Sequence, residues 1–200
     1  MHRDFITIVS GLPRSGTSML MRMLEAGGVP ALTDRERGAD EDNPLGYYEL
    51  ESVKLLPDGG DWLHRAGGRA VKVISALLGK LPAGYEYRIV FLDREIREVL
   101  ASQRRMLERR GEPTDRVPDD QMAEMFRRHV DSVLGRMRER TDVRLLRITH
   151  ADVLGDPVRA ASVLDDFLGG GLDRPAMASA VDASLWRQRY SAPAAGRKGD

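Results

Sequence analysis

The sequence predicts a three-layer α/β fold, in which a central and mainly parallel sheet is flanked by helices on both faces. Short runs of β-branched and aliphatic residues alternate along the chain with segments whose apolar residues recur at helical spacing. A glycine-rich turn joins the first apolar run to the first helical segment. Because 200 residues without an internal repeat suit one globular domain, we expect a single domain over residues 1–191 and a flexible tail at 192–200.

Each expected strand is a short apolar run. These runs occupy residues 5–10, 69–75, 87–92 and 143–148. Helical spacing predicts helices over residues 16–26, 95–109, 119–140 and 157–168. The last of them has Asp156 as its cap and Pro157 in its first turn, which are both good helix starts. Residues 34–43 are acidic and aperiodic and are expected to form a loop, whereas residues 47–56 fit either a strand or a short helix.

The composition excludes several classes of site. The chain has no cysteine, which rules out disulfides, thiolate metal sites and cysteine nucleophiles. Lysine plus arginine and aspartate plus glutamate each total 31, so bulk charge favours no nucleic-acid partner. No apolar stretch approaches the roughly 20 residues that cross a bilayer, and the run Phe5–Val9 is too short for a signal peptide. We therefore expect a cytoplasmic protein with neither nucleic acid nor a membrane as partner; the oligomeric state stays open.

The strongest functional signal is the segment Ser10–Ser18, S-G-L-P-R-S-G-T-S, between the first strand and the first helix. Its glycines allow a tight turn in which several backbone amides point at one anion. The helix that starts near Gly16 adds unsatisfied amides and the positive end of its dipole. Arg14 supplies a full charge, and Thr17 and Ser18 supply hydroxyl donors. The segment is predicted to bind a phosphate.

The position of the cation indicates which phosphate. The triphosphatase pattern G-x-x-x-x-G-K-[ST] has a lysine after its second glycine, but this chain has Thr17 there and carries its cation at Arg14. A kinase or ATPase would therefore lack the lysine that bridges the β- and γ-phosphates. Asp93, which ends an apolar strand as a Mg²⁺-binding aspartate would, keeps an ATP- or GTP-dependent phosphotransferase open as an alternative.

Three segments resemble the sulfotransferase family and occur in family order between Ile6 and Gly169. Residues 13–18, the sequence Pro13, Arg14, Ser15, Gly16, Thr17, Ser18, match the 5'-phosphosulfate loop P-[KR]-S-G-T-[ST] at each position. Arg94 and Ser102, eight positions on, match the pair that binds the donor's 3'-phosphate in the family. The stretch from Ile148 to Gly169 resembles Y-E-D-L…P…F-L-G, with His150 and Ala151 in place of the usual tyrosine and glutamate.

The resemblance implies a P-loop NTPase-like fold and transfer of a sulfuryl group from 3'-phosphoadenylyl sulfate to a small-molecule or peptide acceptor, leaving adenosine 3',5'-bisphosphate. No metal is expected, because sulfuryl transfer needs positioning and charge stabilisation more than covalent help. Arg14 and the loop amides would stabilise the leaving 5'-phosphate. A non-catalytic nucleotide-binding protein on the same fold is the remaining alternative.

The resemblance also indicates catalytic residues. Lys72, a charge in an apolar strand, matches a lysine that family members place near the transferred group. The acceptor hydroxyl must lose its proton to a general base, and residues 43–51 resemble a bacterial segment N-P-x-G-[YFW]-[YFW]-E that offers Glu49. Glu51 is the second candidate, since both glutamates share a face if the stretch is extended; His64 and His150 are lesser ones.

Two arginine-rich segments are interpreted differently. Arg187 and Arg189, beside Trp186, resemble a late basic segment that covers the donor's phosphates in the family, although they also fit a flank for a docked tryptophan. The stretch from Arg104 to Arg110 is interpreted as a solvated helix face.

Overall fold

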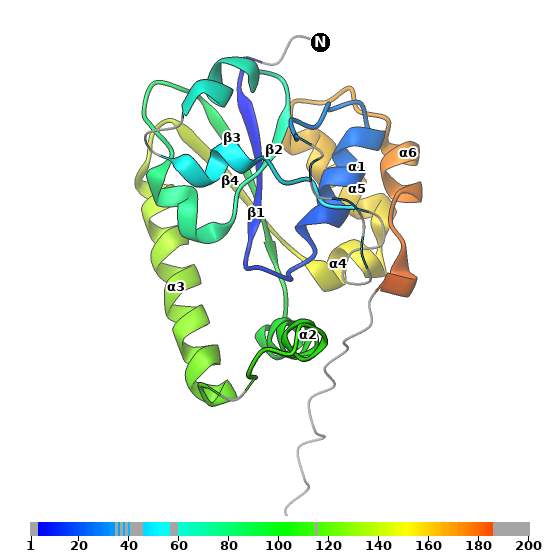
Figure 1. The fold of residues 1–200 in the computed structure, drawn as a ribbon. Coiled ribbons are helices and arrows are strands. Elements are labelled where there is room, and N and C mark those ends of the chain that lie inside the picture. Colours follow the sequence, from blue (N-terminus) through cyan, green and yellow to red (C-terminus); the bar gives the residue numbers. More distant parts are fainter. Residues whose placement is uncertain are drawn as a thin grey trace, which may run out of the picture.

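The computed structural model describes residues 4–34, 36, 38, 40, 46–56, 60–114 and 116–185. Its 4-stranded sheet has the order β2-β1-β3-β4, and every neighbouring pair is parallel (Figure 1). The strands are β1 (Ile6–Gly11), β2 (Ala70–Lys72), β3 (Tyr87–Asp93) and β4 (Val143–Thr149). The predicted parallel α/β architecture is confirmed.

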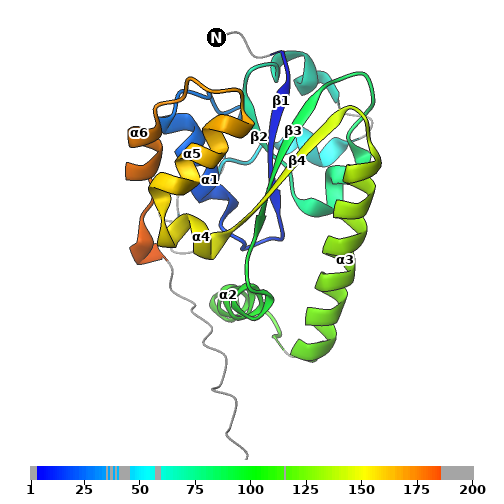
Figure 2. The ribbon, with the colours of Figure 1, turned by 180° about the vertical axis from the view of Figure 1, so that it is seen from behind.

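Helices cover both faces of the sheet (Figures 1 and 2). The α-helices are α1 (Thr17–Ala26), α2 (Ile96–Arg109), α3 (Asp119–Glu139), α4 (His150–Gly155), α5 (Pro157–Phe167) and α6 (Arg174–Ser179). Short 3₁₀ helices are η1 (Glu51–Leu55), η2 (Gly60–Arg65), η3 (Ser75–Lys80) and η4 (Ala183–Leu185). None of the helices in the described part of the chain is long and apolar enough to cross a bilayer.

The core has two halves, one on each face of the sheet. Alternate residues of β1 point to opposite faces, so that Ile8 packs with α3 and the 3₁₀ helices while Val9 packs with α1, α5 and α6. All six residues of β1 are buried, because a parallel strand is covered on both faces. The buried strand β1 therefore fixes the position of the loop that follows Gly11.

The carboxyl ends of the strands meet at one edge of the sheet. The register pairs Gly11 with Leu92 and Val9 with Lys72, so the loop after β1 lies beside the ends of β2 and β3. Helix α2 crosses this edge (Figures 1 and 2). Ligands of open α/β sheets bind at such an edge.

The structure differs from the sequence prediction in two places and decides a third that the sequence left open between a strand and a short helix. Strand β2 ends at Lys72, because η3 begins at Ser75. Residues 46–50 are irregular and lead into η1, so the segment 47–56 is not a strand. Helices α4 and α6 were not expected, although each has a side-chain cap, Thr149 and Asp173 respectively, that was visible in the sequence. The proposed tail at 192–200 lies outside the described residues.

Candidate active site

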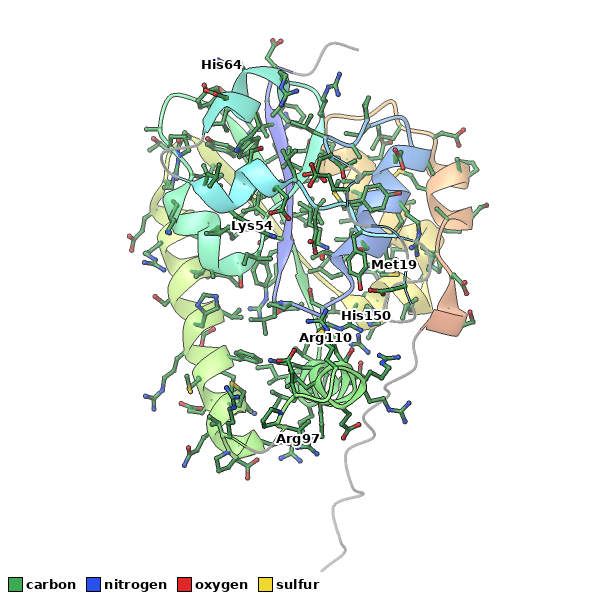
Figure 3. All side chains as sticks on the ribbon, viewed as in Figure 1. Met19, Lys54, His64, Arg97, Arg110 and His150 are labelled. Carbon is green, nitrogen blue, oxygen red and sulfur yellow. The ribbon has the colours of Figure 1, made fainter. Side chains whose placement is uncertain are left out.

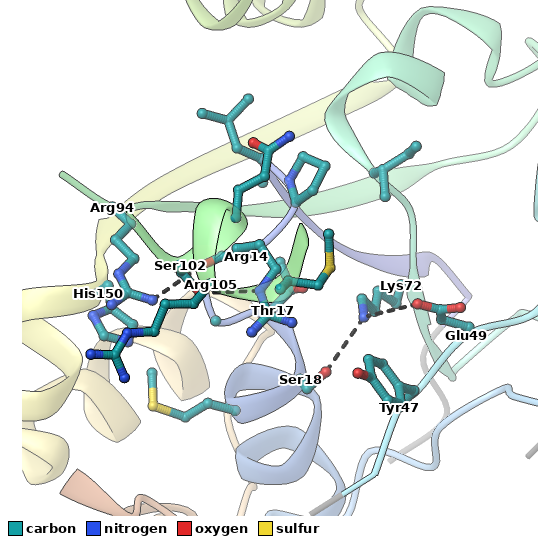
Figure 4. Close-up of a pocket in the computed structure, with 18 of the residues that line it drawn as sticks. Arg14, Thr17, Ser18, Tyr47, Glu49, Lys72, Arg94, Ser102, Arg105 and His150 are labelled. Atoms are coloured by element: carbon teal, nitrogen blue, oxygen red, sulfur yellow. Dashed lines mark hydrogen bonds and ion pairs between the residues drawn. The ribbon is translucent and has the colours of Figure 1, made fainter. Parts of the chain in front are cut away.

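A pocket opens where the loop after β1 faces α2, at the carboxyl edge of the sheet (Figure 4). Loop residues, the first turns of α1, the end of β2 and one side of α2 all line it. Although the whole chain has a formal net charge of zero, acidic lining is confined to Glu49 and Asp182 among the described residues. Its cations are Arg14, Arg22, Lys72, Arg94, Arg105, Arg109 and Arg110. The pocket is therefore built for an anion.

The loop turns so tightly that side chains are excluded at two of its glycines. A Cβ on Gly11 would lie 2.4 Å from Ser15 Oγ and 2.7 Å from the Leu92 carbonyl oxygen. Gly16 has φ 98°, and a Cβ there would lie 2.8 Å from His150 Cδ2. Gly16 also caps α1 without a side-chain hydrogen bond, so the first amides of α1 are left for a ligand.

Arg14 is held in a strained conformation. Its φ of 72° is the one positive value among the non-glycine residues that the structure describes, and such a conformation costs about 1–3 kcal/mol. Arg14 Nε donates to Ser102 Oγ at 3.1 Å, which links the loop to α2. Burial lowers the pKa of Arg14, and the charge of Arg109 acts in the same direction. The strain places a guanidinium at the mouth of the loop.

Arg94 is brought to the same loop from the end of β3. Its Nη1 donates to the Arg14 carbonyl oxygen at 3.0 Å, and its Nε donates to Glu98 Oε2 at 2.9 Å. Both side chains of this ion pair are nearly buried, at 9% and 5% exposure. The predicted pair Arg94 and Ser102 thus lies together beside the predicted phosphate loop, and both residues line the pocket.

Lys72 and Glu49 form the opposite end of the pocket (Figure 4). Lys72 Nζ lies 3.4 Å from Ser18 Oγ and 3.9 Å from Glu49 Oε1, and 5.8 Å from the centroid of the Tyr47 ring. The Glu49 backbone is fixed by Thr33, whose Oγ1 donates to the Glu49 carbonyl oxygen at 2.7 Å. A carboxylate and an ammonium group are therefore held beside each other next to the first turn of α1.

Two other candidate bases are placed outside this pocket. The chain turns into η1 at Glu51, so the two glutamates do not share a face; Glu51 is exposed and pairs with Lys54 at 2.6 Å. His64 lies in η2 near Tyr85, at the far end of the molecule from His150 (Figure 3). Neither of these two alternative bases, Glu51 in η1 and His64 in η2, lines the pocket.

His150 begins α4 and is buried against the loop, at 6% exposure. Burial lowers its pKa from 6.5 to about 4, and the charge of Arg94 adds to this effect. His150 is consequently neutral near pH 7 and adds no charge to the pocket.

Some predicted site residues are not brought into the pocket. The predicted loop residues that line it are Pro13, Arg14, Gly16, Thr17 and Ser18. Ser15 is only 1% exposed, and its hydroxyl is buried against Gly11. Arg187 and Arg189 lie outside the described residues. Asp93 is held in an ion pair by Arg147 and does not line this pocket. Ser15 therefore offers only its backbone to a ligand here.

Several pocket residues escaped the sequence analysis. The arginines of the stretch Arg104–Arg110 are exposed, as predicted, but the sequence analysis missed that Arg105, Arg109 and Arg110 also line the pocket. The Nε of Arg22 is buried without a hydrogen-bond partner among the described residues. Arg22 was visible as a lone charge in the apolar run of α1, the same signal that indicated Lys72.

The buried, neutral His150 should make the fold sensitive to acid. A histidine whose pKa is lower in the folded than in the unfolded state binds fewer protons when folded, so stability falls as the pH drops below 6.5 towards 4. We expect this group to lower the free energy of unfolding by up to about 3 kcal/mol across that range. Denaturant unfolding at a series of pH values measures it.

The matched variants are His150→Gln and His64→Gln. As the pH falls from 6.5 towards 4, the free energy of unfolding of the unaltered protein should fall relative to that of His150→Gln. His64→Gln, which alters an exposed histidine, should leave the pH dependence unchanged. Parallel pH profiles for His150→Gln and the unaltered protein would contradict the prediction.

The fold and the pocket together define an α/β protein of the P-loop-like class with a pocket lined mainly by cations after its first strand. No family model and no curated protein matches the chain. Among solved structures, the sulfotransferase domain of the Synechococcus PCC 7002 olefin synthase matches with a TM-score of 0.58 at 17% identity, over 96% of this chain and 90% of that one.

Two further sulfotransferases have similar structures. Sulfotransferase STF1 of Mycobacterium tuberculosis H37Rv matches with a TM-score of 0.57 at 15% identity, over 92% of this chain and 73% of that one. Mouse sulfotransferase SULT7A1, solved in complex with PAP, matches with a TM-score of 0.50 at 18% identity, over 92% and 64% of the two chains. This chain therefore has the sulfotransferase fold.

Proposed function

We propose that the protein is a sulfotransferase that moves the sulfuryl group of 3'-phosphoadenylyl sulfate onto an acceptor hydroxyl. The observation that carries the proposal is that the loop after β1 and the pair Arg94 and Ser102, which the sequence predicts to bind the two ends of the donor, line one pocket. The loop that would bind the donor's 5' end is linked through Arg14 to Ser102, and Arg94 binds the carbonyl oxygen of Arg14. Two phosphates of one nucleotide would thus be bound by adjoining groups.

In the proposed reaction, the loop amides, the first turn of α1 and Arg14 bind the 5'-phosphosulfate. The acceptor oxygen attacks sulfur and forms a new S–O bond, while the bond between sulfur and the bridging oxygen breaks and its electron pair passes to the leaving 5'-phosphate. Lys72 stabilises the charge on the transferring group. Glu49 accepts the proton of the acceptor hydroxyl. In this scheme the cationic side chains and the loop amides stabilise the developing charge, and no metal ion takes part.

The phosphotransferase alternative finds less support in this pocket. Thr17 occupies the position of the lysine that would bridge the phosphates of a triphosphate. Asp93, its candidate Mg²⁺ ligand, is paired with Arg147.

The test is nucleotide binding in the presence of EDTA. Adenosine 3',5'-bisphosphate should raise the melting temperature, and replacing Arg94 should weaken its binding by about 10–100-fold, the effect of losing one charge-assisted hydrogen bond. Binding of adenosine 5'-phosphate, which lacks the 3'-phosphate, should change far less. Calorimetric titration gives both affinities.

Because Arg94→Ala removes the cation of a nearly buried ion pair with Glu98, the informative variant is Arg94→Gln combined with Glu98→Gln. Arg97→Gln, an exposed charge at the start of the same helix, is the control. An equal loss of affinity for both nucleotides would remove Arg94 from the 3'-phosphate site. Stabilisation by Mg-ATP alone would favour the phosphotransferase.

A further inference from the structure

The groups that the sequence assigns to the 3'-phosphate are electrostatically weak in the folded protein. Arg94 and Glu98 form a nearly buried ion pair whose net charge is zero. Ser102 is neutral, and its hydroxyl accepts a hydrogen bond from Arg14. A phosphate monoester carries a charge of about −1.5 to −2 at neutral pH. Arg94 and Ser102 therefore give a phosphate hydrogen bonds but almost no net countercharge.

His150 does not supply that charge. It lies at the same end of the pocket as Arg94 (Figure 4), but it is buried against the loop and electrically neutral. Arg14, the cation that donates to Ser102, is already assigned to the donor's 5' end, so further charge for the 3'-phosphate would come from another element that lines this end of the pocket.

Arg105 has the required position and charge. It follows Ser102 by three residues on α2, so the two side chains lie on the same side of the helix. Both line the pocket, and in Figure 4 the Arg105 side chain extends towards the end formed by Arg94 and His150, away from Lys72 and Glu49. Its guanidinium makes no hydrogen bond or ion pair with any residue that the structure describes.

The neighbouring charges on α2 support the same assignment. Arg105 and Arg109 are four residues apart, a spacing at which like charges repel on a helix. Both line the pocket. Arg104, beside them in sequence, instead pairs with Asp119 at 2.6 Å. The helix thus concentrates positive charge on its pocket side, where an anion would relieve the repulsion.

We infer that Arg105 provides the principal countercharge of the donor's 3'-phosphate, next to the hydrogen bonds of Arg94 and Ser102. The inference rests on the proposed function. It makes Arg105 a second residue, beside Arg94, that distinguishes a 3'-phosphorylated nucleotide from its 3'-dephospho form: Arg105 acts through its charge, and Arg94 acts through its hydrogen bonds.

The test compares Arg105→Gln with Arg104→Gln, which removes an equal charge from the adjacent position. Affinities for adenosine 3',5'-bisphosphate and adenosine 5'-phosphate are measured by calorimetric titration. Arg105→Gln should weaken binding of the bisphosphate by about tenfold or more and that of the monophosphate by less than about twofold. Arg105→Lys, which keeps the charge, should recover part of the loss, and Arg104→Gln should preserve the ratio of the two affinities.

Two failures are distinguishable. If the unaltered protein binds both nucleotides equally, the proposed function itself fails. If the unaltered protein prefers the bisphosphate and Arg105→Gln keeps that preference, the proposed function stands and the role of Arg105 is overturned. An equal loss of affinity for both nucleotides also overturns this role, because Arg105 would then attract the nucleotide in general and not its 3'-phosphate.

Discussion

Replacing Glu49 by glutamine should lower turnover by about 10²–10⁴-fold, the range that a positioned general base contributes. Glutamine keeps the size of the side chain but cannot take the acceptor proton. Binding of adenosine 3',5'-bisphosphate should be unchanged or slightly stronger, because the substitution removes a negative charge 3.9 Å from Lys72. A panel of alcohols and phenols is first screened with the unaltered protein to find an acceptor. Turnover with that acceptor is then measured as release of the bisphosphate from the donor.

Glu51→Gln is the matched control for this experiment. Glu51 is two residues away and carries the same charge, but it is exposed and paired with Lys54. We expect its turnover to match that of the unaltered protein. Normal turnover in Glu49→Gln would refute the assignment of the base, and a loss confined to Glu51→Gln would reverse it.

Replacing Gly16 by alanine should weaken binding of adenosine 3',5'-bisphosphate by at least about 100-fold. The new Cβ would meet His150 Cδ2 at 2.8 Å and Nε2 at 3.2 Å, so either the loop or the buried imidazole must move. The φ of 98° adds backbone strain of about 1–2 kcal/mol for a residue with a side chain. Because the amides that we propose to bind the 5'-phosphate belong to this loop, a small displacement would misalign several hydrogen bonds together.

Gly28→Ala separates strain from displacement of the loop. Gly28 has φ 93°, close to that of Gly16, but no atom lies within 4 Å of a Cβ built on it. Both variants should lose comparable stability through strain, and only Gly16→Ala should lose nucleotide affinity. Thermal unfolding and calorimetric titration of the two variants measure the two effects. Unaltered affinity in Gly16→Ala would show that the loop does not enclose the ligand.

The elements of this fold were predictable from the sequence because their signals are local. Hydrophobic periodicity marked every strand of the sheet and the helices α1, α2, α3 and α5. Glycine spacing marked the loop before α1, where conformation depends on φ more than on distant packing. The short helices α4 and α6 escaped prediction because their six residues hold too little periodicity to be recognised.

The assembly of the site was decided by tertiary structure. Arg14 and Ser102 are 88 residues apart in sequence and meet because α2 crosses the carboxyl edge of the sheet. The same packing places Arg105 at the pocket, while the turn into η1 separates Glu49 from Glu51. Sequence by itself predicted the strands, the longer helices and a phosphate-binding loop before α1. Which side chains point into the pocket depends on how those elements pack against one another. No local sequence pattern encodes that packing.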